Sequence, residues 1–277
     1  PDGTITGNPT NWTNQNVTLS ISTTDTGGAG VKSITKPDGT VVTATSTTYV
    51  VTANGTYNFV VTDNAGNAKT VSVSVTNIDK VIPSGTITGN PTAWTNANAT
   101  LTISATDTGG AGVKSITKPD GTIVASASTT YVVTANGTYN FVVTDNAGNT
   151  KTISETVTKI DKVLPDGSAT GNPTAWTNQN VTLTFSATDS NSGVKSIKKP
   201  DGTTVTTAST TFVVSANGTY DFVITDNAGN IKTVSIVVSK IDKTTPGGTI
   251  TGNPTAWTNK DVVLTIKATD SGGAGVK

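Results

Sequence analysis

The sequence repeats itself with a period of about 82 residues, and this period limits the folds open to it. Its four tryptophans, at positions 12, 94, 176 and 257, are spaced by 82, 82 and 81 residues. The shorter spacing arises where the segment from Asp107 to Val113 becomes the shorter segment from Asp189 to Val194. A segment that accepts a change of length is typical of a surface loop. The sequence therefore predicts three copies of one small fold, at residues 1–82, 83–164 and 165–245, and a partial fourth copy at 246–277.

The residue pattern inside each copy favours short β-strands. In the second copy, Leu101, Ile103 and Ala105 alternate with hydroxyl side chains, which is the period of a strand with one buried face. No stretch has a helical period. An all-β antiparallel sandwich is therefore predicted, and a solenoid is the alternative, although solenoid repeats usually span about 20–50 residues. Seven strands are expected in the second copy, at residues 86–88, 100–105, 113–117, 123–124, 131–133, 139–144 and 153–157.

Residues 53–67 recur almost unchanged in the second and third copies, and their pattern indicates a turn, a strand and a second turn. We expect Asn54-Gly55 to form a turn because both residues tolerate a positive φ, and Gly66 to supply the left-handed residue of the second turn. Tyr57 begins the strand, and Phe59 follows two positions later. This pattern is similar to the tyrosine corner of immunoglobulin-like sandwiches, where antibodies carry a cysteine in place of Phe59. We therefore expect tandem immunoglobulin-like units of about seven antiparallel strands each.

The composition excludes most kinds of chemical site. The chain has 277 residues, a formal net charge of +0, and no His, Cys or Met. Without Cys and His, the usual zinc, haem, iron–sulfur and copper sites and the Ser-His-Asp arrangement cannot be built. The aspartates fall in turns and linkers that recur in each copy, so we expect no enzyme. No cofactor is expected with certainty.

The charged residues also limit the partners. Each cationic side chain is a lysine, so the arginine fork that recognises phosphates and bases is missing, and we expect no nucleic-acid partner. No apolar run is long enough to span a bilayer, which predicts no membrane insertion.

Five motifs of the second copy resemble the bacterial immunoglobulin-like repeats of Gram-positive cell-surface and secreted proteins. The motifs are Trp94-Thr95-Asn96, residues 107–113, 135–139 and 144–149, and Ile160-Asp161-Lys162 before a proline. The resemblance implies an extracellular location and a role as a stalk, an adhesin or a wall-associated protein. The partners that it implies are neighbouring copies or further repeats of a longer chain, and a cell wall, glycan or host surface.

Two functions follow from this resemblance. The first is structural: a semi-rigid stalk or fibre of tandem repeats on or outside a bacterial cell. The linker at residues 78–83 supports it, because β-branched residues followed by a proline favour an extended connector, and each unit would be about 30 Å long. The second is an adhesin whose modules bind glycan or protein directly. Binding modules usually gather exposed aromatic residues in variable loops, whereas here the aromatic residues recur at core-like positions, which favours the stalk.

The junctions between copies contain a candidate calcium site. In an immunoglobulin-like sandwich, the entering chain, the loop after the second strand and the turn before the last strand share one pole. Asp79 should therefore approach Asp107, Asp145 and Asn146. Such oxygens would suit Ca²⁺, which takes about six to eight oxygen ligands. The equivalent set at the next junction is Asp161, Asp189, Asp226 and Asn227, and Asp242 and Asp270 begin a third.

A simpler interpretation of these aspartates remains open. Lys80, Lys162 and Lys243 directly follow the linker aspartates and could neutralise the clusters, which would then be only turns and surface ion pairs.

The tryptophan loops and the partial fourth copy give two further expectations. Each tryptophan is expected to close the bottom of its own core, and a contact with the next copy is the alternative. The fourth copy holds only the first two strands of a unit, so we expect the chain to continue past Lys277; the alternative is that a neighbouring molecule supplies the missing strands.

Overall fold

The computed structural model describes all 277 residues, from Pro1 to Lys277. Its regular elements are all β-strands, and it has no helix that could cross a membrane. The chain divides into two compact units. The first comprises Pro1–Asn90 and Ala99–Thr158, and the second comprises Pro91–Asn98 and Lys159–Lys277.

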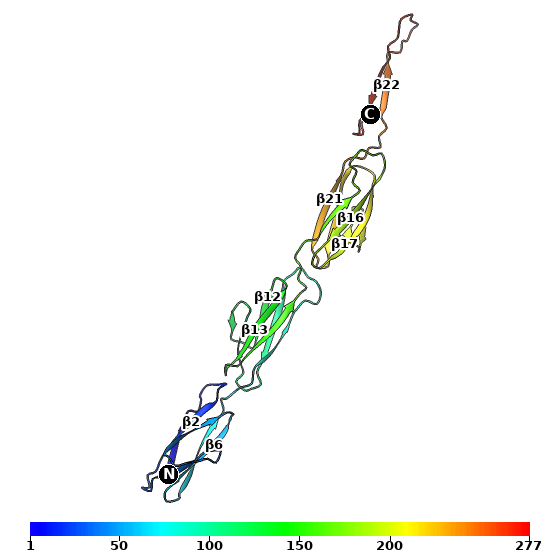
Figure 1. Cartoon of the computed structure of the whole chain (residues 1–277). Helices are drawn as coiled ribbons and strands as arrows, with labels where there is room; N and C mark the ends of the chain where they lie inside the picture. The colour runs from blue at the N-terminus through cyan, green and yellow to red at the C-terminus, as the bar shows by residue number, and fades with distance from the viewer. The chain divides into compact units, whose positions relative to one another are not determined.

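The first unit holds four antiparallel sheets, two for each of the first two copies. In the first copy, a three-stranded sheet in the order β1-β2-β5 faces a four-stranded sheet in the order β4-β3-β6-β7. The second copy repeats this arrangement as β8-β9-β12 and β11-β10-β13-β14. In Figure 1, β2 and β6 mark the two sheets of the first copy, and β12 and β13 those of the second. The strands of the first copy are β1 (Asp2–Thr6), β2 (Val17–Thr24), β3 (Val31–Thr35), β4 (Val41–Val42), β5 (Ser46–Val51), β6 (Gly55–Asp63) and β7 (Ala68–Val75). Those of the second are β8 (Ser84–Thr88), β9 (Ala99–Thr106), β10 (Val113–Thr117), β11 (Ile123–Val124), β12 (Ser128–Val133), β13 (Gly137–Asp145) and β14 (Thr150–Val157).

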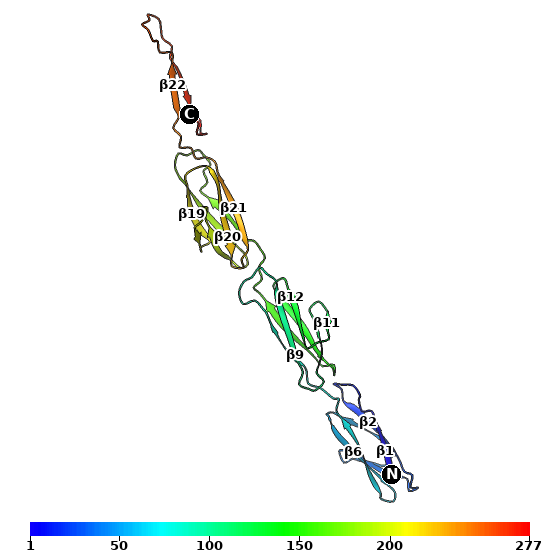
Figure 2. The ribbon, with the colours of Figure 1, turned by 180° about the vertical axis from the view of Figure 1, so that it is seen from behind.

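The second unit holds the third copy and a hairpin. The sheets of the third copy have the orders β15-β16-β19 and β18-β17-β20-β21, and Figure 2 shows β19, β20 and β21 from behind. The hairpin pairs β22 with β23. The strands are β15 (Asp166–Thr170), β16 (Val181–Thr188), β17 (Val194–Lys198), β18 (Thr204–Val205), β19 (Ser209–Val214), β20 (Gly218–Asp226), β21 (Ile231–Val238), β22 (Gly247–Thr251) and β23 (Thr265–Thr269).

The seven strands expected in the second copy are all present, which confirms the predicted sandwich. Several are longer than expected, because serine and threonine residues at their ends join the ladders without adding to the apolar alternation. The boundaries of the copies at 82, 164 and 245 remain a prediction from the sequence.

Strand β6 shows how the alternating pattern builds the core. Phe59 and Val61 are fully buried on the core-facing side of β6, whereas Asn58, on the opposite side of the strand, is exposed. Leu19 of β2 and Ile34 of β3 pack in the same cluster, so the core fills the space between the two sheets. The third copy adds an aromatic pair to its core: Phe185 stacks on Phe222 with the ring centroids 4.2 Å apart.

The tyrosine corner is present in all three copies. The Tyr57 hydroxyl donates to the main-chain oxygen of Ala53 at 2.6 Å, and Tyr139 and Tyr220 make the same bond, each at 2.7 Å. Gly66 has a φ of +90°, as expected for the second turn.

The chain turns between β5 and β6 next to Asn54-Gly55, as expected, but without the positive φ that was expected of these two residues. No residue other than glycine has a positive φ, and Gly55 is not among the glycines that do. The Asn54 side chain instead pairs with the main chain of Ile78, donating to its oxygen at 2.9 Å and accepting from its nitrogen at 2.8 Å. The side-chain amide thus makes the two hydrogen bonds that the main chain of a neighbouring strand would make. The chain turns at the tyrosine corner without a residue in the left-handed region.

The fourth copy consists of the β22–β23 hairpin. Ile250 is 64% exposed and Ile266 is 74% exposed, although the equivalent β2 residue of the first copy, Ile21, is buried.

Candidate metal centre at the linker aspartates

The linker after the first copy is held on both sides before it reaches Asp79. On one side, the Thr13 nitrogen donates to Asn77 O, and the Asp79 nitrogen donates to Thr13 O, both at 2.9 Å. These bonds form a parallel bridge between Thr13 and Ile78. On the other side lies the Asn54 amide, and the Ile78 side chain is part of the core. The linker therefore leaves the first copy as a short paired strand, which fixes the position of Asp79.

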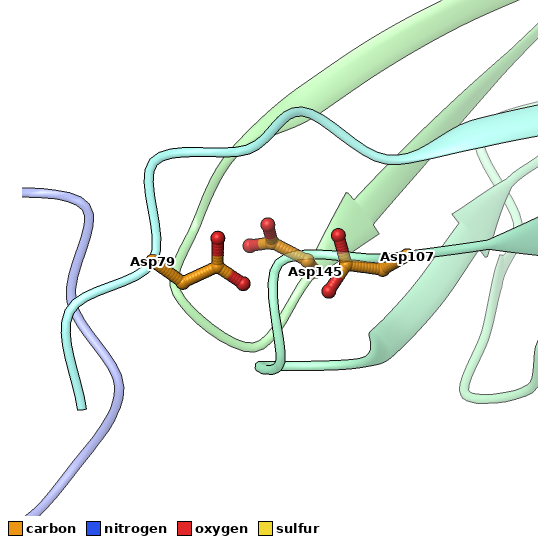
Figure 3. Close-up of side chains that lie close together, drawn as sticks. All are labelled: Asp79, Asp107 and Asp145. Carbon is orange, nitrogen blue, oxygen red and sulfur yellow. The ribbon is translucent and has the colours of Figure 1, made fainter. Parts of the chain in front are cut away.

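Asp79, Asp107 and Asp145 converge at this junction, as expected for elements that share one pole of the sandwich. Asp79 is 2% exposed and Asp145 is fully buried, and carboxylate oxygens of the three residues lie within 4.8 Å of one another. Figure 3 shows the side chains pointing toward a common point, Asp79 from the linker and the other two from the following copy.

Each carboxylate oxygen of this first cluster accepts a hydrogen bond from an N–H group. Asp79 anchors the linker to the loop at residues 107–112, because its Oδ2 accepts from Ala111 N at 2.9 Å. The other bonds run from Val81 N to Asp79 Oδ1, from Gly109 N and Gly112 N to Asp107, and from Asn149 N and Nδ2 to Asp145.

Gly109 allows the linker to approach this closely. A Cβ on Gly109 would lie 1.9 Å from Asp79 Oδ1, far inside van der Waals contact. A Cβ on Gly272 would lie 1.8 Å from Asp242 Oδ1 in the same way. In these two loops the absence of a side chain on the glycine leaves room for the carboxylate of the linker aspartate.

Asp161, Asp189 and Asp226 form a second cluster in the second unit, also with oxygens within 4.8 Å of one another. Asp161 is 1% exposed and Asp226 is fully buried. Burial raises the pKa of Asp161, but hydrogen bonds from Ser192, Val163 and Asn191 outweigh it and hold that pKa below its ordinary value.

Asp242 and Asp270 begin a third cluster, as expected. The pKa of Asp242 is lowered, first by the N–H of Ala274, then by Thr244, with a contribution from Asp270. Ala274 N donates to Asp242 Oδ2 at 2.9 Å, which repeats the bond from Ala111 to Asp79.

The structure assigns Asn146 and Asn227 a supporting position. The Nδ2 of Asn146 donates to the oxygens of Ala111 and Gly112, at 2.8 and 3.2 Å, and Asn227 does the same to Ser192 and Gly193. These amides therefore hold the loop that faces the linker rather than pointing Nδ2 at the carboxylates.

Sequence reasoning missed Asn149 and Asn230, the last residues of the repeated Asp-Asn-Ala-Gly-Asn turns. Asn149 Nδ2 donates to Asp145 Oδ2 at 2.7 Å and to the main-chain oxygen of Asp79 at 3.0 Å. Asn230 repeats both bonds, to Asp226 and Asp161. The signal was available, because an asparagine closes this turn in each complete copy.

The lysines after the linker aspartates do not neutralise the clusters. Lys80 Nζ donates to Asn16 Oδ1 at 2.5 Å, and Lys162 and Lys243 donate in the same way to Asn98 and Asn180. The ion pairs of the chain lie elsewhere, at Pro1–Asp25, Lys69–Asp2 and Lys232–Asp166. Each cluster thus gathers three carboxylates without an ammonium group.

Trp12 and Trp176 do not close their own cores, so for these two residues the expectation was wrong and the contact with the next copy is present. Trp12 is only partly buried and does not belong to the core cluster of the first copy. Its ring lies against the loop of the next copy, where a Cβ on Gly110 would be 3.3 Å from Trp12 Cη2. Trp176 approaches Gly273 similarly. The tryptophans lie outside the core because Ile78 and its equivalents already occupy that end of it.

The donor chemistry of the clusters fits a hard divalent cation. Buried carboxylate oxygens are the ligands that Ca²⁺ prefers, and three of them close together repel one another unless a cation or a proton intervenes. The residues able to hold a metal are Asp79, Asp107 and Asp145 at one junction and Asp161, Asp189 and Asp226 at the next.

Comparison with protein families identifies the class of the chain. The model of the bacterial Ig-like domain matches residues 29–80, 110–162 and 185–243, more than half of the sequence. The chain therefore belongs to the bacterial Ig-like domain family, and its fold is a tandem series of immunoglobulin-like β-sandwiches.

Two further proteins are similar to the chain. Exoglucanase B of Cellulomonas fimi is 28% identical over 270 residues, which cover 84% of this chain and 25% of that protein. The chain thus spans about a quarter of the length of this relative. The crystal structure of a mutant of Salmonella alpha-2-macroglobulin aligns with 97% of this chain and 25% of its own, at 9% identity and a TM-score of 0.24.

Proposed function

We propose that the chain is a non-catalytic, extracellular structural segment: a semi-rigid stalk of tandem Ig-like repeats on or outside a bacterial cell, with joints that calcium stiffens. Its partners in this proposal are further repeats of a longer chain and the functional part that they carry. The family membership and the similarity to a quarter of a multi-part relative support such a role.

The observation that carries the proposal is the bonding of the linker to the copies on both sides of it. Asp79 donates through its nitrogen to Thr13 of the preceding copy. Its main-chain oxygen accepts from Asn149 Nδ2, and its Oδ2 accepts from Ala111 N, both in the following copy. Asp79 thus bonds to the sandwiches on both sides of it, and these bonds restrict the motion of the linker.

Calcium is the cation that we assign to the joints. The clusters offer carboxylate oxygens, no ammonium group competes for them, and the linker, loop and turn that supply them come from both sides of a joint. A cation bound there would hold the linker to the next copy and remove the repulsion among the carboxylates. We expect a dissociation constant on the order of 10⁻⁴ to 10⁻³ M, as in extracellular calcium modules.

We assign no glycosidase activity to the chain. The aspartates that meet are tied to N–H groups of their own joint, and the same arrangement recurs at the next junction, as suits a structural element repeated along the chain. The relative named an exoglucanase shares only a quarter of its length with this chain.

The test compares the whole chain in EGTA and in millimolar calcium chloride, by small-angle X-ray scattering and thermal unfolding. Calcium should raise the melting temperature and reduce the flexibility seen in the scattering curve. Magnesium is the control, because its demand for near-ideal octahedral geometry suits these clusters less well. The same curves with and without calcium would remove the metal from the proposal.

A glycan array probed with the whole chain separates the stalk from an adhesin. The stalk predicts no saturable binding. Specific saturable binding to a glycan would replace the stalk with the adhesin function.

A further inference from the structure

The two complete aspartate clusters differ in the loop that faces the linker. The first loop runs Asp107-Thr-Gly-Gly-Ala-Gly, and the second is one residue shorter, Asp189-Ser-Asn-Ser-Gly. In the first, Gly109 leaves no room for a side chain beside Asp79 Oδ1. In the second, Asn191 occupies this place, and its Nδ2 donates to Asp161 Oδ1 at 3.3 Å. The shortened loop thus adds a side-chain amide to the cluster.

The rest of the loop keeps its role in both clusters. Ser192 N donates to Asp161 Oδ2 at 2.9 Å, as Ala111 N does to Asp79 Oδ2. These two N–H groups are therefore matched reporters, one for each cluster.

The carboxylates of the two clusters also differ in how well they are satisfied. In the first cluster all of the oxygens accept an N–H bond. In the second, Asp189 Oδ1 accepts from Asn191 N, Ser192 Oγ and Gly193 N, whereas Asp189 Oδ2 is buried and has no hydrogen-bond partner. A buried carboxylate oxygen without a hydrogen-bond donor costs free energy, and a bound cation would offset that cost.

We infer that the cluster of Asp161, Asp189 and Asp226 binds calcium more tightly than that of Asp79, Asp107 and Asp145, so that the two joints load in sequence. This inference rests on the proposed function. The open Oδ2 of Asp189 is one free ligand oxygen, and the amide of Asn191, turned about its last torsion, supplies a neutral one. One additional amide oxygen, and one carboxylate oxygen that no N–H group occupies, should lower the dissociation constant of the second site by about tenfold, since ligand number and charge set calcium affinity.

The test is a calcium titration of the whole, unmodified chain followed by ¹H–¹⁵N NMR. The cross-peaks of Ser192 and Ala111 report the two sites separately. The midpoint for Ser192 should fall at about a tenfold lower free calcium concentration than that for Ala111. Equal midpoints, or an earlier one for Ala111, would overturn the inference and leave the proposed calcium joints intact. If neither peak moved, the calcium part of the proposed function would fail together with the inference.

A pair of variants tests the role of Asn191 itself. Asn191→Gly removes the amide and should shift the Ser192 midpoint toward that of Ala111. Ser190→Thr, which copies Thr108 of the first loop without touching the amide, should leave the Ser192 midpoint unchanged. If both variants kept the original Ser192 midpoint, the amide would have no part in the tighter binding.

Discussion

The side-chain Nδ2 of Asn149 donates to the main-chain oxygen of Asp79 at 3.0 Å, across 70 positions of the sequence. The same nitrogen donates to Asp145 Oδ2 at 2.7 Å. One amide therefore ties the turn of the second copy to the linker that precedes it. The equivalent residue of the first copy, Asn67, makes the corresponding bonds to Asp63.

Replacing Asn149 with alanine should weaken the second copy by about 1–3 kcal/mol, because the buried carboxylate of Asp145 loses a donor and the linker loses its anchor. Asn67→Ala is the matched control and should cost about 0.5–1.5 kcal/mol less, the net value of one hydrogen bond. Native-state hydrogen exchange of amides in β13 and β6 measures the two free energies of opening. Equal losses would mean that the bond to Asp79 adds no stability.

Replacing Gly109 with alanine should open the first joint, because the added Cβ would meet Asp79 Oδ1 at 1.9 Å. We expect a destabilisation of about 1–3 kcal/mol and weaker calcium binding at this cluster. Gly27→Ala is the matched control one period earlier, where the nearest atom would be Asp25 Oδ1 at 3.5 Å, an ordinary contact. Differential scanning calorimetry with and without calcium compares the two variants, and similar curves would contradict the close approach.

Replacing Tyr57 with phenylalanine should destabilise the first copy by about 0.5–1.5 kcal/mol, because it removes the donor to Ala53 O. Tyr49→Phe provides the control, since the third copy carries Phe212 at the corresponding position of its strand. Hydrogen exchange at the buried amides of β6 measures both changes. A loss of the same size in Tyr49→Phe would show that the corner bond is not what stabilises this turn.

Acid should weaken the second joint when no calcium is present. The pKa of Asp161 in the folded chain lies below its ordinary value of 3.8, so its contribution to stability is complete above that pH and is lost as the pH falls through the folded pKa. Thermal unfolding of chelator-treated protein in calcium-free buffers between neutral pH and about pH 2 should therefore show a loss of stability below 3.8 that Asp161→Asn reduces. If Asp161→Asn unfolded with the same acid dependence as the unchanged chain, the hydrogen-bonded carboxylate of Asp161 would not be the source of the acid sensitivity.

The features that repeat in the sequence could be predicted well, because local rules govern them. The alternation around Phe59, the tyrosine corner and the left-handed Gly66 depend on residues close in sequence, and all three are present. The clustering of Asp79 with Asp107 and Asp145 could be predicted only with one further fact, which is that the linker, the loop and the turn share a pole of the sandwich.

The predictions that failed concern the direction of flexible polar groups and of one ring. The lysine next to Asp79 turns away to Asn16, a choice that depends on the loop facing it rather than on sequence spacing. The turn at Asn54 forms without a positive φ, and its side-chain amide bonds to the main chain of Ile78. Trp12 lies outside the core because the linker isoleucine already occupies that place. In each case the deciding partner lies far away along the chain.

The parallel bridge between Thr13 and Ile78 has a mechanical consequence. Its hydrogen bonds, and those from the Asn54 amide, run across the linker, so a force that draws the linker along its own direction loads them all together in shear. Bonds loaded in this way must break at once, whereas bonds in a peeling geometry break singly. The attachment of each linker to its sandwich should therefore resist a pull along the linker more strongly than the same bonds would if they were loaded one at a time.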